Sequence, residues 1–173
     1  MVIDKETKNE GNVIMIYTFK TMTQEQAENI AFTWHYEGRY SFYDMEADEE
    51  DLAEFLDSKK RGNSTYAVLK GTELIGFLSV YKDTDKSCEI GLGMRPDITG
   101  KGKGQEFLHN ALDFIQSELR PEKICLSVAA FNQRAINVYR KVGFIDKETY
   151  MQDTNGSMYE FLKMEYECNN ICM

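Results

Sequence analysis

Five of the chain's twelve glycines fall between positions 91 and 104, where average usage of about 7% would place one. Two lie in the strand-like run 87–94 and three on the turn into the amphipathic run 105–119: Gly91, Gly93, Gly100, Gly102 and Gly104. Glycine at a strand-to-helix turn lets the backbone approach a ligand closely. Because a helix N-terminus also carries partial positive charge, this turn predicts an anion site, usually for phosphate.

The turn matches neither of the two common phosphate loops. A Walker loop needs Gly-Lys-Ser/Thr, whereas Gly104 is followed by Gln105 and Glu106. The dinucleotide fingerprint G-x-G-x-x-G fails because the last glycine comes one residue too early. Lys101 and Lys103 add positive charge to the turn. A flexible turn without a ligand is the alternative interpretation.

The two glycines inside the strand-like run suggest a second binding feature. Gly91 and Gly93 share a strand face with Glu89, and glycine inside a strand often marks a bulge or a close backbone neighbour. A strand that bulges and parts from its neighbour exposes N–H and C=O groups to an extended amide ligand. Coenzyme A fits both features, because it carries a pyrophosphate and a pantetheine arm with two amides.

The apolar periodicity predicts the order of the secondary-structure elements. Helical spacing predicts helices over residues 23–34, 48–59, 105–119 and 132–142, the first beginning with a Thr23–Gln26 capping box. Strands are predicted over residues 12–20, 64–70, 73–82, 87–94, 122–128, 147–153 and 157–166. This order predicts an α/β (α+β) fold with a mixed sheet. We expect a flexible leader over residues 1–14, one domain over 15–167 and a frayed tail over 168–173.

Charge narrows the possible partners. Lys plus Arg total 20 and Asp plus Glu total 29, a formal net charge of −9. Such a chain gains no general electrostatic help in binding nucleic acid or an anionic membrane, but it attracts protonated amines. Residues 1–11 are too polar for a signal peptide, and no apolar run is long enough to span a bilayer. We therefore expect a cytoplasmic protein with reduced thiols.

The cysteines and histidines do not form a metal-binding pattern. Neither His35 nor His109 has the spacing of a metal ligand. Cys168 and Cys172 form a lone pair in the expected tail, which is weak evidence for a metal. We expect no metal, and we expect the remaining cysteines, Cys88 and Cys125, to be buried in strands.

Two motifs in the chain resemble those of the GNAT superfamily of N-acetyltransferases. Residues 99–104 (TGKGKG) resemble its acetyl-CoA-binding motif Arg/Gln-x-x-Gly-x-Gly/Ala, with Thr99 in the place of Arg or Gln. The preceding CEIGLGMRPD is similar to the fourth strand of the family. Residues 132–144 (NQRAINVYRKVGF) resemble Asn-x-x-Ala-x-x-x-Tyr-x-x-x-Gly-Phe. The resemblance covers roughly residues 15–166.

The resemblance implies a GNAT-like single domain, with a bent, mixed and mostly antiparallel sheet of about seven strands and about four helices. The sheet is splayed between its fourth and fifth strands, acetyl-CoA occupies the split, and an amine acceptor enters from the other side. The backbone of Leu92 and Met94 would pair with pantetheine, and the glycine turn would hold the pyrophosphate. The implied cofactor-binding residues are Leu92, Gly93, Met94, Thr99, Gly100, Lys101, Gly102, Lys103, Gly104, Gln105, Asn132, Ala135 and Tyr139.

Two residues are candidates for proton transfer. A lysine-like amine with a pKa near 10.4 must lose a proton before attack, which costs about 4–5 kcal/mol at pH 7. Glu89 is the candidate base, acting directly or through a water, although it could be a solvent-facing strand charge. Tyr139 matches the motif tyrosine and is the candidate acid for the leaving thiolate. Its alternative is core packing, because it shares a helical stripe with Ala135, Ile136 and Val142.

The aperiodic segment 35–47 is expected to form the acceptor side. Tyr36, Tyr40, Phe42 and Tyr43 could make an aromatic wall for a cation, or could pack between the two neighbouring helices. The acidic run over residues 44–51 is more typical of a solvated helix start than of an amine site.

The sequence therefore predicts an acetyl-CoA-dependent N-acetyltransferase that transfers directly in a ternary complex. The acceptor is a small-molecule or peptide amine of unspecified identity. A non-catalytic CoA-binding or CoA-sensing module on the same fold is one alternative, and a binder of another phosphate ligand, such as a nucleotide, is a second. A homodimer through the C-terminal strands is possible.

Overall fold

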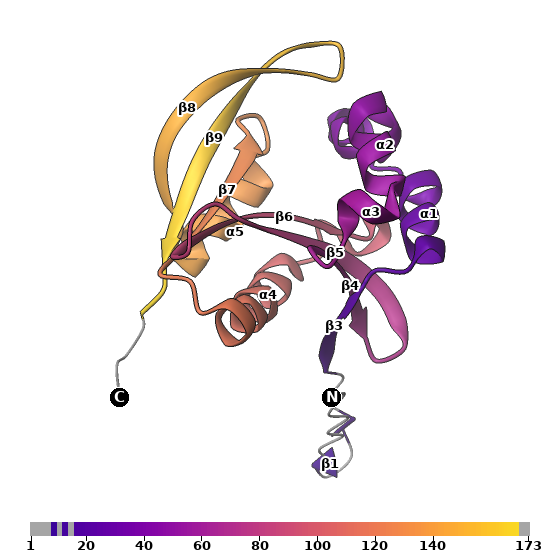
Figure 1. Ribbon diagram of the computed structural model, residues 1–173, viewed down its shortest axis with the longest axis vertical. Coiled ribbons are helices and arrows are strands. Elements are labelled where there is room, and N and C mark those ends of the chain that lie inside the picture. Colours follow the sequence, from indigo (N-terminus) through magenta and orange to yellow (C-terminus); the bar gives the residue numbers. More distant parts are fainter. Residues whose placement is uncertain (1–7, 10–11, 14–15, 170–173) are drawn as a thin grey trace.

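The computed structural model describes residues 8–9, 12–13 and 16–169, and its centre is one seven-stranded sheet (Figure 1). The strand order is β3-β4-β5-β6-β7-β9-β8, and every neighbouring pair is antiparallel except β6 and β7, which are parallel. The sheet is therefore mixed and mostly antiparallel, as predicted. Its strands are β3 (Tyr17–Thr21), β4 (Thr65–Lys70), β5 (Glu73–Lys82), β6 (Ser87–Met94), β7 (Lys123–Ala129), β8 (Ile145–Thr154) and β9 (Ser157–Glu167).

Helices cover both faces of the sheet. The α-helices are α1 (Gln24–Thr33), α2 (Glu49–Leu56), α3 (Ser58–Arg61), α4 (Gly104–Leu119) and α5 (Gln133–Val142). Short 3₁₀ helices are η1 (Gly38–Tyr43), η2 (Met45–Ala47) and η3 (Pro96–Ile98). Figure 1 shows α4 on one side of the sheet and α1, α2 and α3 grouped on the other. None of the described helices is long and apolar enough to cross a membrane.

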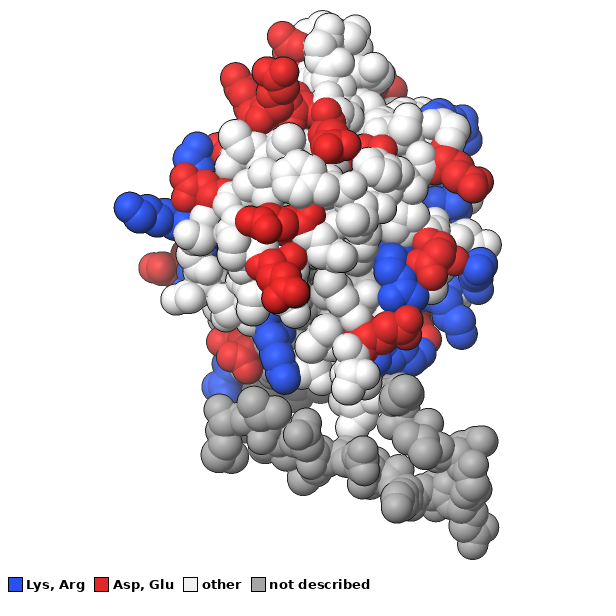
Figure 2. Space-filling view, turned by 90° about the vertical axis from the view of Figure 1, so that its right-hand side faces the viewer, with Lys and Arg blue, Asp and Glu red and all other residues white. Residues whose placement is uncertain are grey.

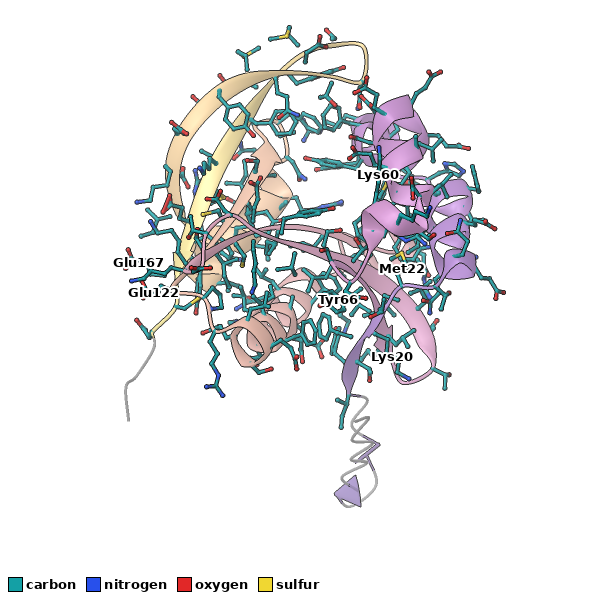
Figure 3. The ribbon with its side chains drawn as sticks, viewed as in Figure 1. Lys20, Met22, Lys60, Tyr66, Glu122 and Glu167 are labelled. Carbon is teal, nitrogen blue, oxygen red and sulfur yellow. The ribbon has the colours of Figure 1, made fainter. Side chains whose placement is uncertain are left out.

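Each face of the sheet has its own apolar core. The apolar stripe of α4, which includes Phe107 and Ile115, packs with Leu78 and other residues that point the same way from the strands. On the other face, Ile30 of α1 packs with Ala67 of β4. Figure 3 shows Tyr66 on the α4 side and Met22 beside the α1–α3 group. The sheet therefore lies between the two helical layers.

The second predicted helix, over residues 48–59, is two helices in the structure. The Asp57 carboxylate accepts hydrogen bonds from the N–H groups of Lys59 and Lys60, at 2.8 and 3.3 Å, and caps the start of α3. Asp57 itself has an extended conformation. Because a capping side chain competes with helix continuation, α2 ends at Leu56 and α3 begins at Ser58.

The predicted strand over residues 12–20 is also divided. Tyr17–Thr21 pairs with β4 in the main sheet, whereas β2 (Asn12–Val13) pairs with β1 (Lys8–Asn9) in a separate two-stranded sheet. The main ladder ends where Tyr17 meets Lys70, because β4 stops there and the chain turns at Gly71. The other residues of the expected leader lie outside the described part of the chain.

The described start of the expected C-terminal tail is packed rather than frayed. Cys168 is buried, and its N–H donates to the carbonyl of Glu122 at 2.9 Å, which extends the β7–β9 pairing by one step. Burial raises the pKa of the Cys88 thiol to about 11, and the neighbouring Cys168 and Cys125 add to this rise. Cys125 is half-buried rather than buried. Cys172 lies outside the described residues.

Candidate active site

The parallel strands β6 and β7 separate partway along their length. Their register covers Ser87–Glu89 against Lys123–Cys125 and ends there. Beyond this point β6 continues to Met94 and β7 continues to Ala129, with no pairing between them. We call this unpaired region the wedge. The splay predicted between the fourth and fifth strands of the sheet is confirmed.

The edge of β6 presents backbone groups to the wedge. In an antiparallel ladder, the N–H and C=O groups of alternate residues point to the partner strand. Arg95 N–H bonds to Ile75 O at one end of the β5–β6 ladder, and Asp83 N–H bonds to Ser87 O at the other. Odd-numbered residues of β6 therefore turn to β5, while Leu92 and Met94 turn their backbone groups into the wedge.

The edge of β7 faces the wedge in the same way. Ala130 N–H bonds to Glu160 O, and Cys168 N–H bonds to Glu122 O, at the two ends of the β7–β9 ladder. Even-numbered residues of β7 therefore turn to β9, and Ser127 and Ala129 turn theirs to the wedge. Two strand edges thus offer donors and acceptors to an extended, amide-bearing ligand.

The bulge expected at the strand glycines is absent from the described β5–β6 ladder. Pairing runs without a register shift from Gly76 opposite Met94 to Lys82 opposite Cys88. A Cβ atom on Gly93 would lie 2.4 Å from the ring of Phe77, the residue opposite it. Glycine is needed at position 93 because the Phe77 ring lies over the strand there. β6 therefore separates from β7 while its pairing with β5 stays regular.

The predicted phosphate turn has the backbone that its glycines allow. Gly100 and Gly102 have φ values of 71° and 76°, in the left-handed region that disfavours residues with a Cβ. Lys101 and Lys103 are exposed, and neither is ion-paired with a described carboxylate. The turn therefore carries two uncommitted positive charges.

Helix α4 begins directly after this turn with free N–H groups. Lys103 is its N-cap and makes no side-chain capping hydrogen bond. The first helical bond runs from Phe107 N–H to Lys103 O. Among the described residues, nothing accepts from the N–H groups of Gly104, Gln105 and Glu106. Unpaired N–H groups at a helix start suit a phosphate, so these residues fit the pyrophosphate of CoA.

Three of the residues implied by the resemblance are committed to local hydrogen bonds. The Thr99 hydroxyl donates to Pro96 O at 2.7 Å, so its proton is already used within η3. The Asn132 Oδ1 atom accepts from Ala135 N–H at 3.1 Å and caps α5. The Thr99 hydroxyl and the Ala135 N–H group therefore have no free proton to donate to a cofactor.

Arg134, in the first turn of α5, is a candidate that the sequence reasoning missed. A Cβ atom on Gly100 would lie 3.0 Å from its guanidinium, so this group lies directly against the phosphate turn. The guanidinium also stacks on Tyr40, 4.2 Å from the ring centre. A cation in the first turn of a helix opposes the helix dipole, and this was the available sequence signal.

The candidate acceptor residues belong to one closed loop, residues 36–44, which we call the strap. Asp44 ties its ends, because its carboxylate accepts from Tyr36 N–H at 2.8 Å and lies 3.1 Å from His35 Nδ1. The Tyr36 hydroxyl donates to Met94 O at 2.7 Å, on the β6 edge of the wedge. Burial raises the Tyr36 pKa above the usual tyrosine value.

The other end of the strap reaches the opposite edge of the wedge. The Tyr43 Oη atom accepts from Ala129 N–H at 3.3 Å and from Asn132 Nδ2 at 3.2 Å. Burial raises the pKa of Tyr43, and these two donors oppose the rise. The strap therefore crosses the wedge from β6 to β7, a placement that no local pattern indicated.

The aromatic residues of the strap do not pack between the two neighbouring helices. Phe42 lies edge-on to Phe131 and Tyr159, with ring centres 5.4 and 4.8 Å away, and it also contacts Phe161 of β9. These partners lie on the β7–β9 side of the wedge. The predicted alternative of packing between the two helices is therefore wrong, because Phe42 packs against Phe131 and the far strand β9 instead.

The two candidate proton-transfer residues lie at different depths. Glu89 is the last β6 residue that pairs with β7, and its side chain is exposed on the side away from α4. It forms no ion pair with a described residue. Tyr139 packs against Phe144, with ring centres 5.7 Å apart. Burial raises the Tyr139 pKa, and the nearby Tyr43 raises it further.

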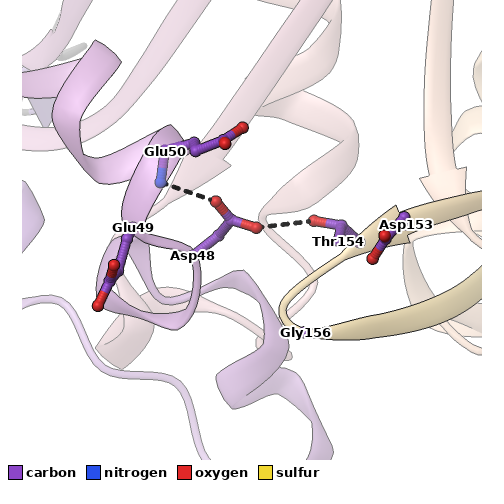
Figure 4. A pocket seen from close by; sticks show the side chains of 6 residues that line it. All are labelled: Asp48, Glu49, Glu50, Asp153, Thr154 and Gly156. Atoms are coloured by element: carbon purple, nitrogen blue, oxygen red, sulfur yellow. Dashed lines mark hydrogen bonds between the residues drawn. The ribbon is translucent and has the colours of Figure 1, made fainter.

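One residue of the acidic run over residues 44–51, Asp48, has a structural role. Asp48 caps α2 through Glu50 N–H at 3.0 Å and also accepts from Asn155 N–H at 3.0 Å in the β8–β9 turn. Figure 4 shows this hollow, with Asp48 between α2 and Thr154. These contacts lower the pKa of Asp48. Among the described residues, no cluster of His, Cys, Asp and Glu has the geometry to hold a metal ion.

The strap closure should depend on pH through His35. The hydrogen bond to Asp44 raises the pKa of His35, so the contribution of this contact is complete below about pH 6.5. It is lost as the pH rises through the raised pKa of the folded protein. We expect an NMR titration of His35 to have its midpoint above 6.5, and Asp44→Asn to lower that midpoint. An identical midpoint in both proteins would contradict the closure.

Comparisons with known proteins agree with the fold. A profile of the acetyltransferase (GNAT) domain matches residues 17–145. Spermidine N(1)-acetyltransferase of Vibrio cholerae is 28% identical over 81 residues, 46% of this chain and 47% of that protein. The match thus spans about half the length of that relative. Acetyltransferase PseH of Campylobacter jejuni is 27% identical over 109 residues, 60% of this chain and 68% of that protein.

Solved structures show the same fold. The spermidine N-acetyltransferase from Vibrio cholerae in complex with CoA and spermine superposes with a TM-score of 0.66 at 22% identity, covering 87% of this chain and 95% of that one. The Campylobacter jejuni PseH complex with acetyl coenzyme A has a TM-score of 0.62 at 22% identity, covering 88% and 99%.

Proposed function

Since the chain belongs to the GNAT acetyltransferase family, we propose that it is an N-acetyltransferase that moves the acetyl group of acetyl-CoA to a primary amine. Transfer is direct, with both substrates bound in one complex. The observation that carries the proposal is the wedge: two strand edges that pair with no other strand there end beside a helix start with free N–H groups. This combination fits the amides and the phosphates of one extended ligand.

The residues of the wedge divide the work. Leu92 and Met94 hold the pantetheine arm through their backbone, with Gly93 between them, and the glycine turn with the start of α4 holds the phosphates. Glu89 takes the amine proton, directly or through a water, at the point where the strands part. Tyr139 supplies a proton to the leaving sulfur. Acetyl-CoA, when bound, supplies the activated acetyl group as a thioester.

The acceptor is proposed to be a cationic amine. The chain has a net charge of −9, which draws cations toward it. Figure 2 shows acidic side chains gathered over the upper part of the face that α1, α2 and α3 present. The first turn of α2 contributes three of the acidic residues, Glu49, Glu50 and Asp51. One relative acts on spermidine by its name, and one similar solved structure is a complex with spermine, so these two amines head the candidate acceptors.

Release of free thiol from acetyl-CoA tests the proposed function. The protein is incubated with acetyl-CoA and a panel of polyamines, amino acids, aminoglycosides, and lysine and N-terminal peptides. We expect amine-dependent thiol release and an acetylated product with one of these classes. Tight CoA binding without transfer to any amine would favour the non-catalytic alternative, and stabilisation by ATP but not by CoA would overturn the proposal.

Arg134 should contribute to cofactor affinity. Its guanidinium lies against Gly100, where it can form charge-assisted hydrogen bonds with a phosphate in the turn. Such a bond to a charged group contributes about 1.5–3 kcal/mol, and we expect the lower end for this exposed side chain. Arg134→Ala should therefore raise the Kd for CoA about 10-fold by calorimetry.

The matched control is Arg140→Ala. Arg140 belongs to the same helix, but its guanidinium is paired with Asp146 instead of facing the turn. Its loss should leave the CoA Kd within about twofold of the native value, because its guanidinium does not face the turn. Its surface ion pair with Asp146 also contributes little to the stability of the fold. Equal Kd values for both variants would remove Arg134 from the phosphate site.

A further inference from the structure

The strap brings a second phenol to the wedge, on the edge opposite the pantetheine-pairing strand. We propose that Tyr43 is a second proton donor for the leaving sulfur, acting beside Tyr139. The inference rests on the proposed function, because it assigns a role in the same acetyl transfer. It starts from the hydrogen bonds that Tyr43 makes and from the one that it does not make.

The Tyr43 hydroxyl uses both of its acceptor positions. A hydroxyl offers one proton to donate and two lone pairs that accept. Ala129 N–H and Asn132 Nδ2 occupy the two lone pairs, at 3.3 and 3.2 Å. Among the described residues, no group accepts the hydroxyl proton. The proton is therefore available to a ligand.

The position of Ala129 places this proton in the wedge. Ala129 N–H belongs to the set of β7 groups that point toward β6, so the oxygen it bonds lies on the β7 edge of the unpaired region. Tyr36 makes the contrasting contact on the β6 edge, where its hydroxyl spends its proton on Met94 O. Of these two strap hydroxyls, only that of Tyr43 can donate to a bound molecule.

The same two donors stabilise the product of proton transfer. As the amine nitrogen bonds to the acetyl carbon, the carbon–sulfur bond breaks and its electron pair leaves with sulfur. Tyr43 gives its proton to that sulfur and becomes a phenolate, which Ala129 N–H and the Asn132 amide hold. The ammonium loses one proton to Glu89 before attack and a second as the amide forms, and Glu89 passes each to water. Tyr43 then regains a proton from water, and the balance closes.

Tyr139 lacks this support in the described structure. No described N–H or O–H group donates to its oxygen, and burial disfavours its phenolate. The Asn132 side chain links the two phenols, because it caps α5, the helix that carries Tyr139, and also donates to Tyr43. We therefore expect the two phenols to share the donor role, with each able to replace the other in part. Asn132 is a positioning residue, because one side chain caps α5 and holds Tyr43.

Tyrosine-to-phenylalanine variants test the shared role. Tyr43→Phe and Tyr139→Phe should each lower kcat with little change in the CoA Kd. The double variant should lose about 10²–10⁴-fold, the usual range for removing acid–base catalysis. Tyr66→Phe is the matched control, because this phenol lies on the α4 side of the sheet and packs on Phe114. Its kcat should stay within about twofold of the native value, because Tyr66 lies on β4, which β5 separates from β6 and the wedge.

A more acidic fluorotyrosine at position 43 separates proton donation from a structural role. The substitution keeps the hydroxyl and both accepted hydrogen bonds. If Tyr43 donates its proton, kcat measured in the Tyr139→Phe background should gain an alkaline limb at the lowered pKa. The ¹⁹F resonance at position 43 should also shift when CoA is added, independently of turnover, whereas a fluorotyrosine at position 66 should not respond.

The outcomes distinguish the inference from the proposed function. If the native enzyme is active, either of two results overturns the inference alone. The double variant has the same kcat as Tyr139→Phe, or the ¹⁹F resonance at position 43 does not shift when CoA is added. An active fluorotyrosine variant without the new alkaline limb has the same consequence. A native protein that acetylates no amine overturns the proposed function, whatever the ¹⁹F signal does.

Discussion

Glu89→Gln is expected to lower kcat for acetyl transfer by about 10²–10⁴-fold at neutral pH, with the Kd for CoA unchanged. Glu89 is the last residue of β6 that pairs with β7, so its carboxylate lies where the wedge begins. Glutamine keeps the size and the strand position but cannot take a proton. Stopped-flow or steady-state kinetics of thiol release measure the loss of kcat.

The acceptor provides an internal check on this role. An amine with a pKa near 10.4 costs about 4–5 kcal/mol to deprotonate at pH 7, whereas one near 8 costs about 1. Glu89→Gln should therefore harm transfer to the first kind of amine more than to the second. Glu148→Gln, on the exposed strand β8, is the control and should leave kcat unchanged. Equal losses in both variants would show that Glu89 is not the base.

Phe107→Ala should destabilise the protein by about 3–5 kcal/mol, the range for removing a fully buried aromatic ring. Phe107 is 1% exposed and lies in the first turns of α4, which follow the phosphate turn. A methyl group on Gly76 of β5 would lie 2.5 Å from its ring, which shows how closely helix and sheet approach. Removing the ring leaves a cavity at this contact. Chemical denaturation measures the free energy of unfolding.

The control for this prediction is Phe32→Ala. Phe32 lies on α1 and is 48% exposed, so its truncation should change the free energy of unfolding by no more than about 0.5 kcal/mol. A loss below about 1 kcal/mol for Phe107→Ala would mean that α4 is not held to the sheet by this ring. CoA binding by the Phe107 variant would then be expected to match that of the native protein.

Local patterns in the sequence predicted the local structure well. The Thr23–Gln26 capping box forms both of its hydrogen bonds, at 3.0 and 3.1 Å, because its partners are three residues apart. Asn155 and Gly156 have positive φ values of 51° and 77°, as a tight hairpin turn requires. The divided helix at Asp57 was missed because a buried-face pattern does not show where a side chain caps.

The chemistry of the wedge depends on contacts that span much of the chain. Tyr36 meets Met94 across 58 positions, and Tyr43 meets Ala129 across 86. The sequence showed that segment 35–47 is rich in aromatic residues. Its hydrogen bonds to β6 and β7, however, depend on how far these two strands separate. Arg134 was inside a recognised motif, yet its neighbour Gly100 was evident only from the packing of α5 against the turn.

The sequence alone determined the glycine turn, the helix that follows it and the succession of strands along the chain. Each of these depends on residues within a few positions of one another. The tertiary structure decided which hydroxyls, guanidinium groups and strand edges meet at the wedge. That outcome depends on the splay between two parallel strands and on a loop closed across it. Neither property has a period or a spacing that a single sequence can display.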